Sequence, residues 1–318
     1  MSEATWWRHL RGDPSRFLLD DEEPGVVWRT QLELLARPGD SPAVQRAREQ
    51  ARRKGAATYI LAQQHPMGYW GSPGAYGARW SGTAWQVIAL AALGADPEDP
   101  RVDRAAATLL QLVQPTSGGF SPARGKIPAS CFTAEVCAAL ARFGFAHHPR
   151  LREAMAWLAE REGGHGGWTC PELRHLIDGG CPVTAVAVLR LVAELGENER
   201  SRLRGLAERA ASWLLDHGLF LSGGAPRGWL EFCHPELSRT DLLDALAAMA
   251  RAGRPMAPPI AATLPLVIAR QDDQACWRQH HRVPFGEPAG EPSRWLTLKA
   301  LVALAAYGVA PLPAEAPV

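Results

Sequence analysis

The sequence predicts an all-α protein, a single (α/α)6 toroid in which an inner ring of helices is surrounded by an outer ring. A short landmark that ends in an aromatic residue recurs five times, at intervals of 48 to 61 residues. An almost wholly apolar helical segment follows each landmark, and in the first four units a glycine and an amphipathic segment come next. Because neither kind of helix can bury its apolar face alone, the units are expected to close on one another.

This repeat predicts one domain over residues 1–318, with N-terminal closing helices in residues 1–40 and a frayed tail at 309–318. The landmark consists of Gln or Arg, a few polar residues, a glycine in four of the five units, and an aromatic residue. Its copies are Gln63–Gly68–Trp70, Gln114–Gly119–Phe120, Arg161–Gly167–Trp168, Arg227–Gly228–Trp229 and Gln271–Trp277. The aromatic side chain is expected to lock one helix pair onto the next.

The predicted inner helices are rich in Ala, Leu and Val nearly all round, which is typical of a helix buried on most sides. They are Val26–Leu35, Thr83–Leu93, Phe132–Phe143, Thr184–Leu195, Leu242–Ala250 and Leu296–Tyr307. Candidates for their N-terminal caps and first turns are Ser81, Ser130, Pro182, Thr240 and Ser293. The glycines that suit their C-terminal ends are Gly94, Gly144, Gly196 and Gly253.

The predicted outer helices carry Arg and Glu on one face and Ala, Leu or Trp on the other. They are Pro42–Gln63, Pro100–Val113, Pro149–Glu160, Arg200–Asp216 and Pro258–Arg270. Six inner helices need six outer partners, and the segment Trp6–Leu10 is the candidate for the sixth.

Composition excludes several classes of protein. The net charge of +1 offers no bulk attraction for nucleic acid, and the apolar runs are too short to span a bilayer. The N-terminus shows no signal-peptide pattern, and six cysteines in a chain of 318 residues do not form a disulfide framework. We therefore expect a cytoplasmic protein with free or metal-bound thiols. Peripheral membrane contact and a protein partner stay open.

The landmark on a helix-pair repeat resembles the squalene-cyclase-type repeats of the terpenoid cyclase and protein prenyltransferase superfamily. The similarity covers residues 59–307. It implies an α/α toroid and an isoprenoid-handling enzyme that acts on a prenyl or prenyl diphosphate substrate in a central apolar cavity. Such landmarks report on fold more directly than on activity.

Residues 118–133 are similar to a stretch of prenyltransferase β subunits that runs Gly-Gly, Arg, Lys, Pro, Asp-x-Cys, Tyr. In that family the Arg and Lys hold the isoprenoid diphosphate, while the Asp and Cys ligate zinc. The resemblance implies diphosphate binding by Lys126 and Arg124 and a zinc ligand at Cys131. Ala129 occupies the place of the Asp, and the family's His ligand has no counterpart at the start of the next inner helix.

The segment from Ser130 to Glu135 also resembles the Asp-Cys-Thr-Ala-Glu motif of cyclases, in which the Asp donates a proton, but its first residue is not acidic. Three acids are candidates for a proton donor or base: Glu135, Asp178 and Asp241. A carboxylic acid in an apolar cavity has a raised pKa and can donate a proton. The alternative for Glu135 and Asp241 is stabilisation of a helix N-terminus.

In such a ring the N-termini of the inner helices meet at one mouth, and their positive ends favour thiolates and anions. Cys131, Cys170 and Cys181, with Asp241 or His234 as the fourth ligand, predict a tetrahedral zinc site there. The alternative is that these cysteines are small buried apolar residues and that no cofactor is bound.

Trp85 and Phe132 lie on predicted inner helices and are expected to line the cavity, because aromatic faces stabilise carbocations. Three functions stay open. An isoprenoid cyclase or transferase predicts a deep apolar cavity with Lys126 at its mouth. A non-catalytic binding or scaffold ring predicts a filled centre. A carbohydrate-active ring needs two carboxylates across a groove, for which Asp178 and Asp241 are the candidates.

Overall fold

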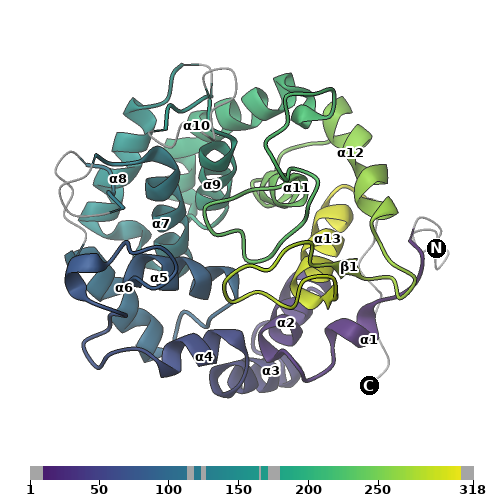
Figure 1. The fold of residues 1–318 in the computed structure, drawn as a ribbon, viewed down its shortest axis with the longest axis horizontal. Coiled ribbons are helices and arrows are strands. Elements are labelled where there is room, and N and C mark those ends of the chain that lie inside the picture. The colour runs from purple at the N-terminus through teal and green to yellow at the C-terminus, as the bar shows by residue number, and fades with distance from the viewer. Residues whose placement is uncertain (1–9, 113–117, 123–126, 165, 171–179, 309–318) are drawn as a thin grey trace.

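The computed structural model describes residues 10–112, 118–122, 127–164, 166–170 and 180–308. This part of the chain is mostly helical, and Figure 1 shows its helices arranged around a common centre. The helices nearest the centre are α5 (Thr83–Ala92), α7 (Ser130–Arg142), α9 (Pro182–Ala193), α11 (Leu242–Arg251) and α13 (Arg294–Ala306). Each packs on the next along the chain, and α13 also packs on α2 (Pro24–Arg29) and the π-helical turn η2 (Thr30–Leu34).

The remaining helices lie outside this layer in Figure 1. They are α3 (Pro42–Arg53), α4 (Ala56–Ala62), α6 (Pro100–Leu112), α8 (Pro149–Glu160), α10 (Glu197–Asp216) and α12 (Pro258–Ala269). The short elements are α1 (Ser15–Leu18), η3 (Pro73–Ala75), η4 (Phe145–His147) and η6 (Gly218–Phe220), with the antiparallel strands β1 (Trp277–Arg278) and β2 (Pro292–Ser293). The count of six pairs stays a prediction, because most of the segment Trp6–Leu10 lies outside the described residues.

Two predicted details are corrected. The predicted helix Pro42–Gln63 is two helices, which separate at Gly55 with a φ of 107°. The Glu23 carboxylate accepts a hydrogen bond from the Ala56 backbone N–H at 3.1 Å, so the side chain of the residue that precedes α2 satisfies the start of α4. Gly196 begins α10 as its N-cap with a φ of −65°, whereas Gly94, Gly144 and Gly253 have the positive φ expected of a helix C-terminus.

Only some of the predicted N-terminal cap residues occupy those positions in the structure. Ser293 caps α13 as predicted, and its Oγ accepts a hydrogen bond from the Leu296 N–H at 3.1 Å. Pro182 lies in the first turn of α9, also as predicted. Asp241, not Thr240, caps α11. Ser81 and Ser130 are not N-caps, since Gly82 and Ala129 occupy those positions and have no side-chain hydrogen bond to the helix.

The aromatic residue of the landmark is bonded to the helix or turn that precedes it. In four units the indole Nε1 donates a hydrogen bond of 2.7–2.9 Å to the backbone carbonyl ten residues earlier. The donors are Trp70, Trp168, Trp229 and Trp277, and the acceptors are Ile60, Leu158, Leu219 and Val267. Phe120 cannot donate, and there Arg150 binds the corresponding carbonyl of Leu110. The backbone of Trp70, Trp229 and Trp277 also forms a hydrogen bond with the next inner helix, so the prediction that the aromatic residue locks neighbouring units is confirmed for these three tryptophans.

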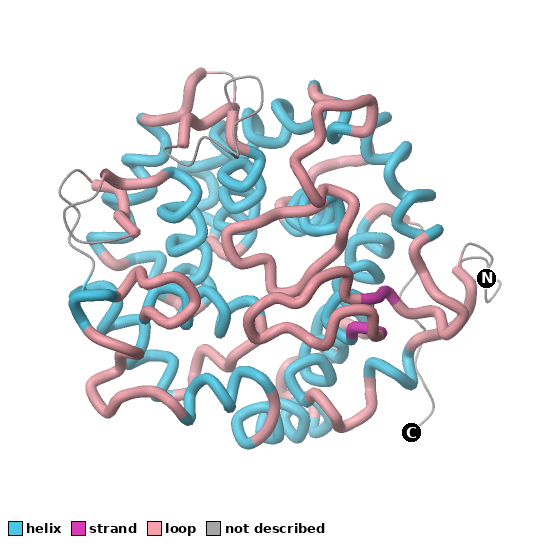
Figure 2. Tube along the Cα trace, viewed as in Figure 1, coloured by secondary structure: helices cyan, strands magenta, loops and turns pink. Residues whose placement is uncertain are grey.

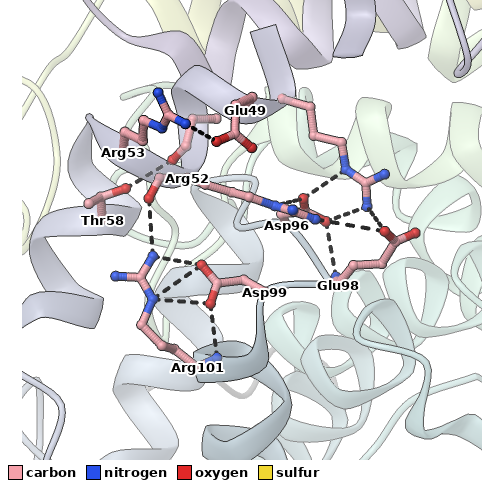
Figure 3. Close-up of polar contacts among 10 residues, drawn as sticks. Glu49, Arg52, Arg53, Thr58, Asp96, Glu98, Asp99 and Arg101 are labelled. Carbon is pink, nitrogen blue, oxygen red and sulfur yellow. Dashed lines mark hydrogen bonds and ion pairs between the residues drawn. The ribbon is translucent and has the colours of Figure 1, made fainter. Parts of the chain in front are cut away.

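An ion-pair network fixes α3 to the connection between α5 and α6 (Figure 3). The Asp96 carboxylate accepts hydrogen bonds from Arg48 at 2.6 and 2.7 Å and from Arg52 at 2.5 Å. Asp99 pairs with Arg101 at 2.6 Å. Every oxygen of these two acids therefore has a cationic partner, which identifies the network as a structural joint.

Asp96→Asn is expected to lower the free energy of unfolding by about 2–3 kcal/mol, because it leaves two arginines beside an uncharged partner in a partly buried joint. The Asp96 side chain is 2% exposed, whereas that of Glu98 in the same network is 70% exposed. Urea unfolding of Asp96→Asn, with Glu98→Gln as the control, checks this. Equal losses in the two variants would contradict a special role for Asp96.

Two loops cross the centre of the ring at the end where α11 and α13 begin, as Figure 2 shows. They comprise residues 221–241 and 279–291, and we call them the covering loops. The His280 N–H donates a hydrogen bond to the Phe232 carbonyl at 3.0 Å, and the His281 ring lies 2.5 Å from the Glu231 carboxylate. These contacts join the two loops into one cover. No helix in the described part of the chain has the length and hydropathy needed to cross a membrane.

Candidate functional site

A cavity of about 140 Å³ lies among the inner helices. Side chains of α5, α7, α9, α11 and α13 line it, together with α2, η2 and the first covering loop. Small apolar residues form a belt around its middle: Ala91, Ala92, Ala138, Ala139, Ala247, Ala248, Leu298 and Val302. Ionisable side chains lie on both sides of this belt. The lining of the cavity is therefore mainly apolar, with ionisable side chains on both sides of the belt.

The ionisable side chains form two groups. The inner cluster lies toward the covering loops and consists of Glu135, Arg190, His234, Glu236, Asp244 and Lys299. The outer cluster lies toward the C-terminal ends of the inner helices and consists of Arg29, Glu33, Arg142, Glu194 and Arg251. Glu135 and Arg142 are seven residues apart on α7, as are Asp244 and Arg251 on α11. On these two helices the clusters are therefore about two helical turns, about 10 Å, apart.

Glu135 is the most enclosed acid of the inner cluster. Its side chain is 2% exposed, and its Oε1 has no hydrogen-bond partner among the described residues. Arg190 lies 3.9 Å from Glu135 and 3.9 Å from Asp244, so one guanidinium serves two carboxyl groups. Burial first, and the charge of Asp244 in addition, raise the pKa of Glu135 to about 8, although Arg190 acts in the opposite direction. Glu135 is therefore largely protonated at neutral pH.

Asp241 has a structural position at the start of α11. Its carboxylate accepts hydrogen bonds from the backbone N–H groups of Asp244 at 2.9 Å and Cys233 at 3.0 Å. Burial and the charge of Asp244 raise its pKa to about 8. Asp241 is not among the residues that line the cavity. These contacts favour the alternative of an N-cap over that of a proton donor to a bound molecule.

Two further side chains of the inner cluster come from different elements. Glu236, on the first covering loop, forms an ion pair with Lys299 of α13. The His234 Nδ1 lies 3.5 Å from Glu236 Oε1. Burial first, and the Lys299 charge in addition, place the pKa of His234 well below its usual value, so this imidazole is neutral.

Each residue of the outer cluster forms an ion pair with another residue of the same cluster. Glu33 pairs with Arg29 and Arg251, and Glu194 pairs with Arg142 at 2.9 Å and Arg251 at 3.5 Å. Burial lowers the pKa of each of the three arginines. Arg142 and Arg251 are the last residues of their helices, where positive side chains stabilise the negative end of the helix dipole.

The predicted zinc ligands are only partly brought together. The sulfur atoms of Cys131 and Cys170 lie 3.1 Å apart, and Cys181 is within hydrogen-bonding reach of Cys131. Hydrogen bonding to Cys170 and Cys181, with burial, raises the pKa of Cys131, so it is a thiol. Neither Asp241 nor His234 joins these cysteines, since both have the positions given above. Across the described ranges, no three His, Cys, Asp or Glu side chains are arranged to hold a metal ion. The donors present do not fit the predicted site, and zinc stays a prediction.

Other predicted site residues lie away from the cavity or outside the described residues. The rings of Trp85 and Phe132 contact each other at 5.4 Å, and neither side chain lines the cavity, which corrects their predicted place. Lys126, Arg124 and Asp178 fall outside the described residues, so their predicted roles stay predictions.

Sequence reasoning missed most of the cavity's charged residues. Arg190, Asp244 and Lys299 each interrupt an otherwise apolar inner helix. A charged residue in a helix that is buried on most sides has to meet a partner or a ligand, and that signal could have located the site.

Comparisons with known proteins give a likeness in structure alone. No protein-family model and no curated protein sequence matches the chain. Structures of the type II terpene cyclase MstE from Scytonema are similar to it. One is a variant in complex with geranylgeranyl dihydroxybenzoate, which is 18% identical to this chain in sequence. The match covers 92% of this chain and 88% of the MstE chain, with a TM-score of 0.46. The apo enzyme has 17% identity, coverages of 90% and 87%, and a TM-score of 0.45. This is a likeness in chain path only, and it supports no statement about activity.

Proposed function

We propose that this chain is an acid-initiated enzyme of the isoprenoid-cyclase type and that Glu135 is its proton donor. The observation that supports this most is the carboxyl group of Glu135, which is enclosed in the wall of the central cavity with one oxygen free of hydrogen bonds. A general acid has to hold its proton at the working pH and face the space that a substrate can occupy. A pKa of about 8 meets the first condition.

The neighbours of Glu135 suit each stage of proton donation. Before transfer, the Asp244 carboxylate favours the protonated form of Glu135. Transfer of the proton to a carbon–carbon double bond gives a carbocation and a glutamate anion. Arg190, 3.9 Å away, stabilises that anion, and Asp244 stabilises the positive charge that has moved to the substrate. Ring closure and the loss of one proton then give a product with the mass of the substrate.

The shape of the cavity favours an amphiphilic substrate. The belt of alanine, leucine and valine side chains would contact a hydrocarbon chain, and the ionisable clusters would contact polar groups at its ends. A prenyl chain with a polar head group has this character. The ligand of the similar MstE structure, geranylgeranyl dihydroxybenzoate, is one example of such a molecule and belongs in the first panel of substrates.

Solvent deuterium provides the test of this proposal. The chain is incubated in D₂O with geranylgeraniol, geranylgeranyl diphosphate, squalene and a geranylgeranylated dihydroxybenzoate, and the products are analysed by mass spectrometry. Acid-initiated cyclisation adds one deuteron and loses one proton, so the cyclic product is expected to be one mass unit heavier than in H₂O. Absence of any cyclic product, or a cyclic product without deuterium, would overturn the proposal.

The second candidate is a ring that binds a polar ligand without chemistry. The number of ion pairs around the cavity supports it, because such a lining also suits recognition. The filled centre expected of such a ring is not what the described residues form, since they enclose a cavity. Binding of a ligand that Glu135→Gln leaves unchanged, without turnover by either protein, would favour this candidate.

A further inference from the structure

His234 is held over the cavity by a matched pair of hydrogen bonds between the covering loops. The Gln279 side chain accepts a hydrogen bond from the His234 N–H at 3.0 Å and donates one to the His234 carbonyl, also at 3.0 Å. Gln279 itself is fully buried. A glutamine that uses both ends of its amide on one residue fixes the position of that residue in the backbone. The imidazole therefore has a defined place in the cavity wall.

The imidazole ring has loose polar contacts, with the Ala92 backbone carbonyl and, at 3.5 Å from Nδ1, with the Glu236 carboxylate. His234 is 5% exposed, and neither Nδ1 nor Nε2 has a hydrogen-bond partner among the described residues. The ring stacks on Trp295 with a centroid distance of 5.2 Å and an angle of 19° between the planes. A buried polar ring without a well-formed hydrogen bond is costly, and such a group in a cavity wall is a candidate for contact with a ligand.

Charged side chains from α11, α13 and both covering loops lie around this ring. Lys299 of α13 disfavours a positive charge on the imidazole, whereas Glu287 of the second covering loop and Asp244 of α11 favour one. Glu236 lies 3.5 Å from Nδ1 and already pairs with Lys299. The imidazole is consequently neutral in the resting protein, and carboxylates are near it if it gains a proton.

We propose that His234 is the proton acceptor that ends the reaction begun by Glu135, and that Gln279 is the residue that positions it. This inference rests on the proposed function and deepens it. A carbocation is a strong acid, so a neutral imidazole is a sufficient base even with a depressed pKa. The stacked rings of His234 and Trp295 also offer the aromatic faces that the rest of the cavity lacks.

A C–H bond next to the cationic carbon breaks, its electron pair forms the new double bond, and the proton moves to a ring nitrogen of His234. Glu236 and Asp244 stabilise the imidazolium. Release of that proton to water and uptake of another by the Glu135 carboxylate restore the resting state. No oxidant, reductant or further reactant is needed.

The test compares product identity rather than rate alone. Wild type, His234→Phe, His234→Gln and Glu135→Gln are incubated with the member of the substrate panel that wild type converts. Both His234 variants are expected to consume substrate, with at least tenfold less of the native isomer in the product mixture. The balance should appear as other double-bond isomers or as an alcohol formed by water capture. Gln279→Ala is expected to give a smaller shift of the same kind, and Glu135→Gln to consume substrate about 10²–10⁴-fold more slowly than wild type.

The controls separate the two proposals. His281→Gln changes a half-exposed histidine of the same covering loops and is expected to keep the wild-type product. A native product pattern in both folded His234 variants would overturn the inference and leave the proposed function standing. Failure of wild type to convert any substrate would overturn both.

Discussion

Glu135→Gln is expected to lower kcat by about 10²–10⁴-fold, the usual contribution of a general acid. Glutamine has the size of glutamic acid and is uncharged, as Glu135 largely is at neutral pH, so the fold should not change. It cannot release a proton to a bound alkene. The loss should therefore lie in kcat, with the dissociation constant of the substrate within a fewfold of the wild-type value.

The same residue predicts the pH dependence of the reaction. Because the pKa of Glu135 is raised to about 8, the active protonated form predominates below that pH and is lost above it. We expect kcat to be level between pH 6 and 7 and to fall about tenfold per unit well above pH 8. The contribution of Glu135 to the stability of the fold also decreases as pH rises. A raised pKa in the folded state means that the contribution of Glu135 to the free energy of unfolding falls as pH rises from its unfolded pKa toward 8.

Steady-state kinetics of wild type and Glu135→Gln, with Glu153→Gln as the matched control on the exposed face of α8, checks this prediction. The control is expected to be indistinguishable from wild type. Full activity in Glu135→Gln would show that another group donates the proton to the substrate. An increase of kcat as pH rises through 8 would show that the ionised form of Glu135 is the active one.

Trp168→Ala is expected to lower the free energy of unfolding by about 3–5 kcal/mol. The Trp168 side chain is fully buried, and its indole donates a hydrogen bond of 2.8 Å to the Leu158 carbonyl at the end of α8. The substitution removes a large apolar volume between two units and leaves that carbonyl without its partner. Unfolding should remain cooperative, since each unit supports its neighbours.

Trp168→Phe separates the two effects, because it keeps much of the apolar volume and removes the donor. We expect a smaller loss, about 1–2 kcal/mol. Leu266→Ala on α12, a side chain that is 40% exposed, is the control and should change stability by less than about 0.5 kcal/mol. Urea unfolding measures all three. A loss in Trp168→Ala no larger than in the control would contradict the assigned role of the landmark aromatic residue.

The sequence predicted the order of the helices. Apolar segments such as Pro182–Ala193 and amphipathic ones such as Pro149–Glu160 follow from periodicity, because burial on all sides or on one side has a direct counterpart in residue pattern. It also determined the role of the landmark tryptophans, because a large aromatic residue at a fixed place in each repeat has one recurring environment. Glu135 was among the acids it selected, although the reason was a motif rather than a view of the cavity.

Which side chains share the cavity could not be predicted from the sequence, because it depends on how distant segments pack. Glu135, Arg190, Asp244 and Lys299 come from four helices, and His234 from a loop whose path no periodicity predicts. Trp85 and Phe132 were expected there because they lie on inner helices, but a helix that is buried all round has only one face toward the centre, and the residue pattern does not say which. The raised pKa of Glu135 and the lowered pKa of His234 have the same origin, because burial and neighbouring charge depend on how distant segments pack.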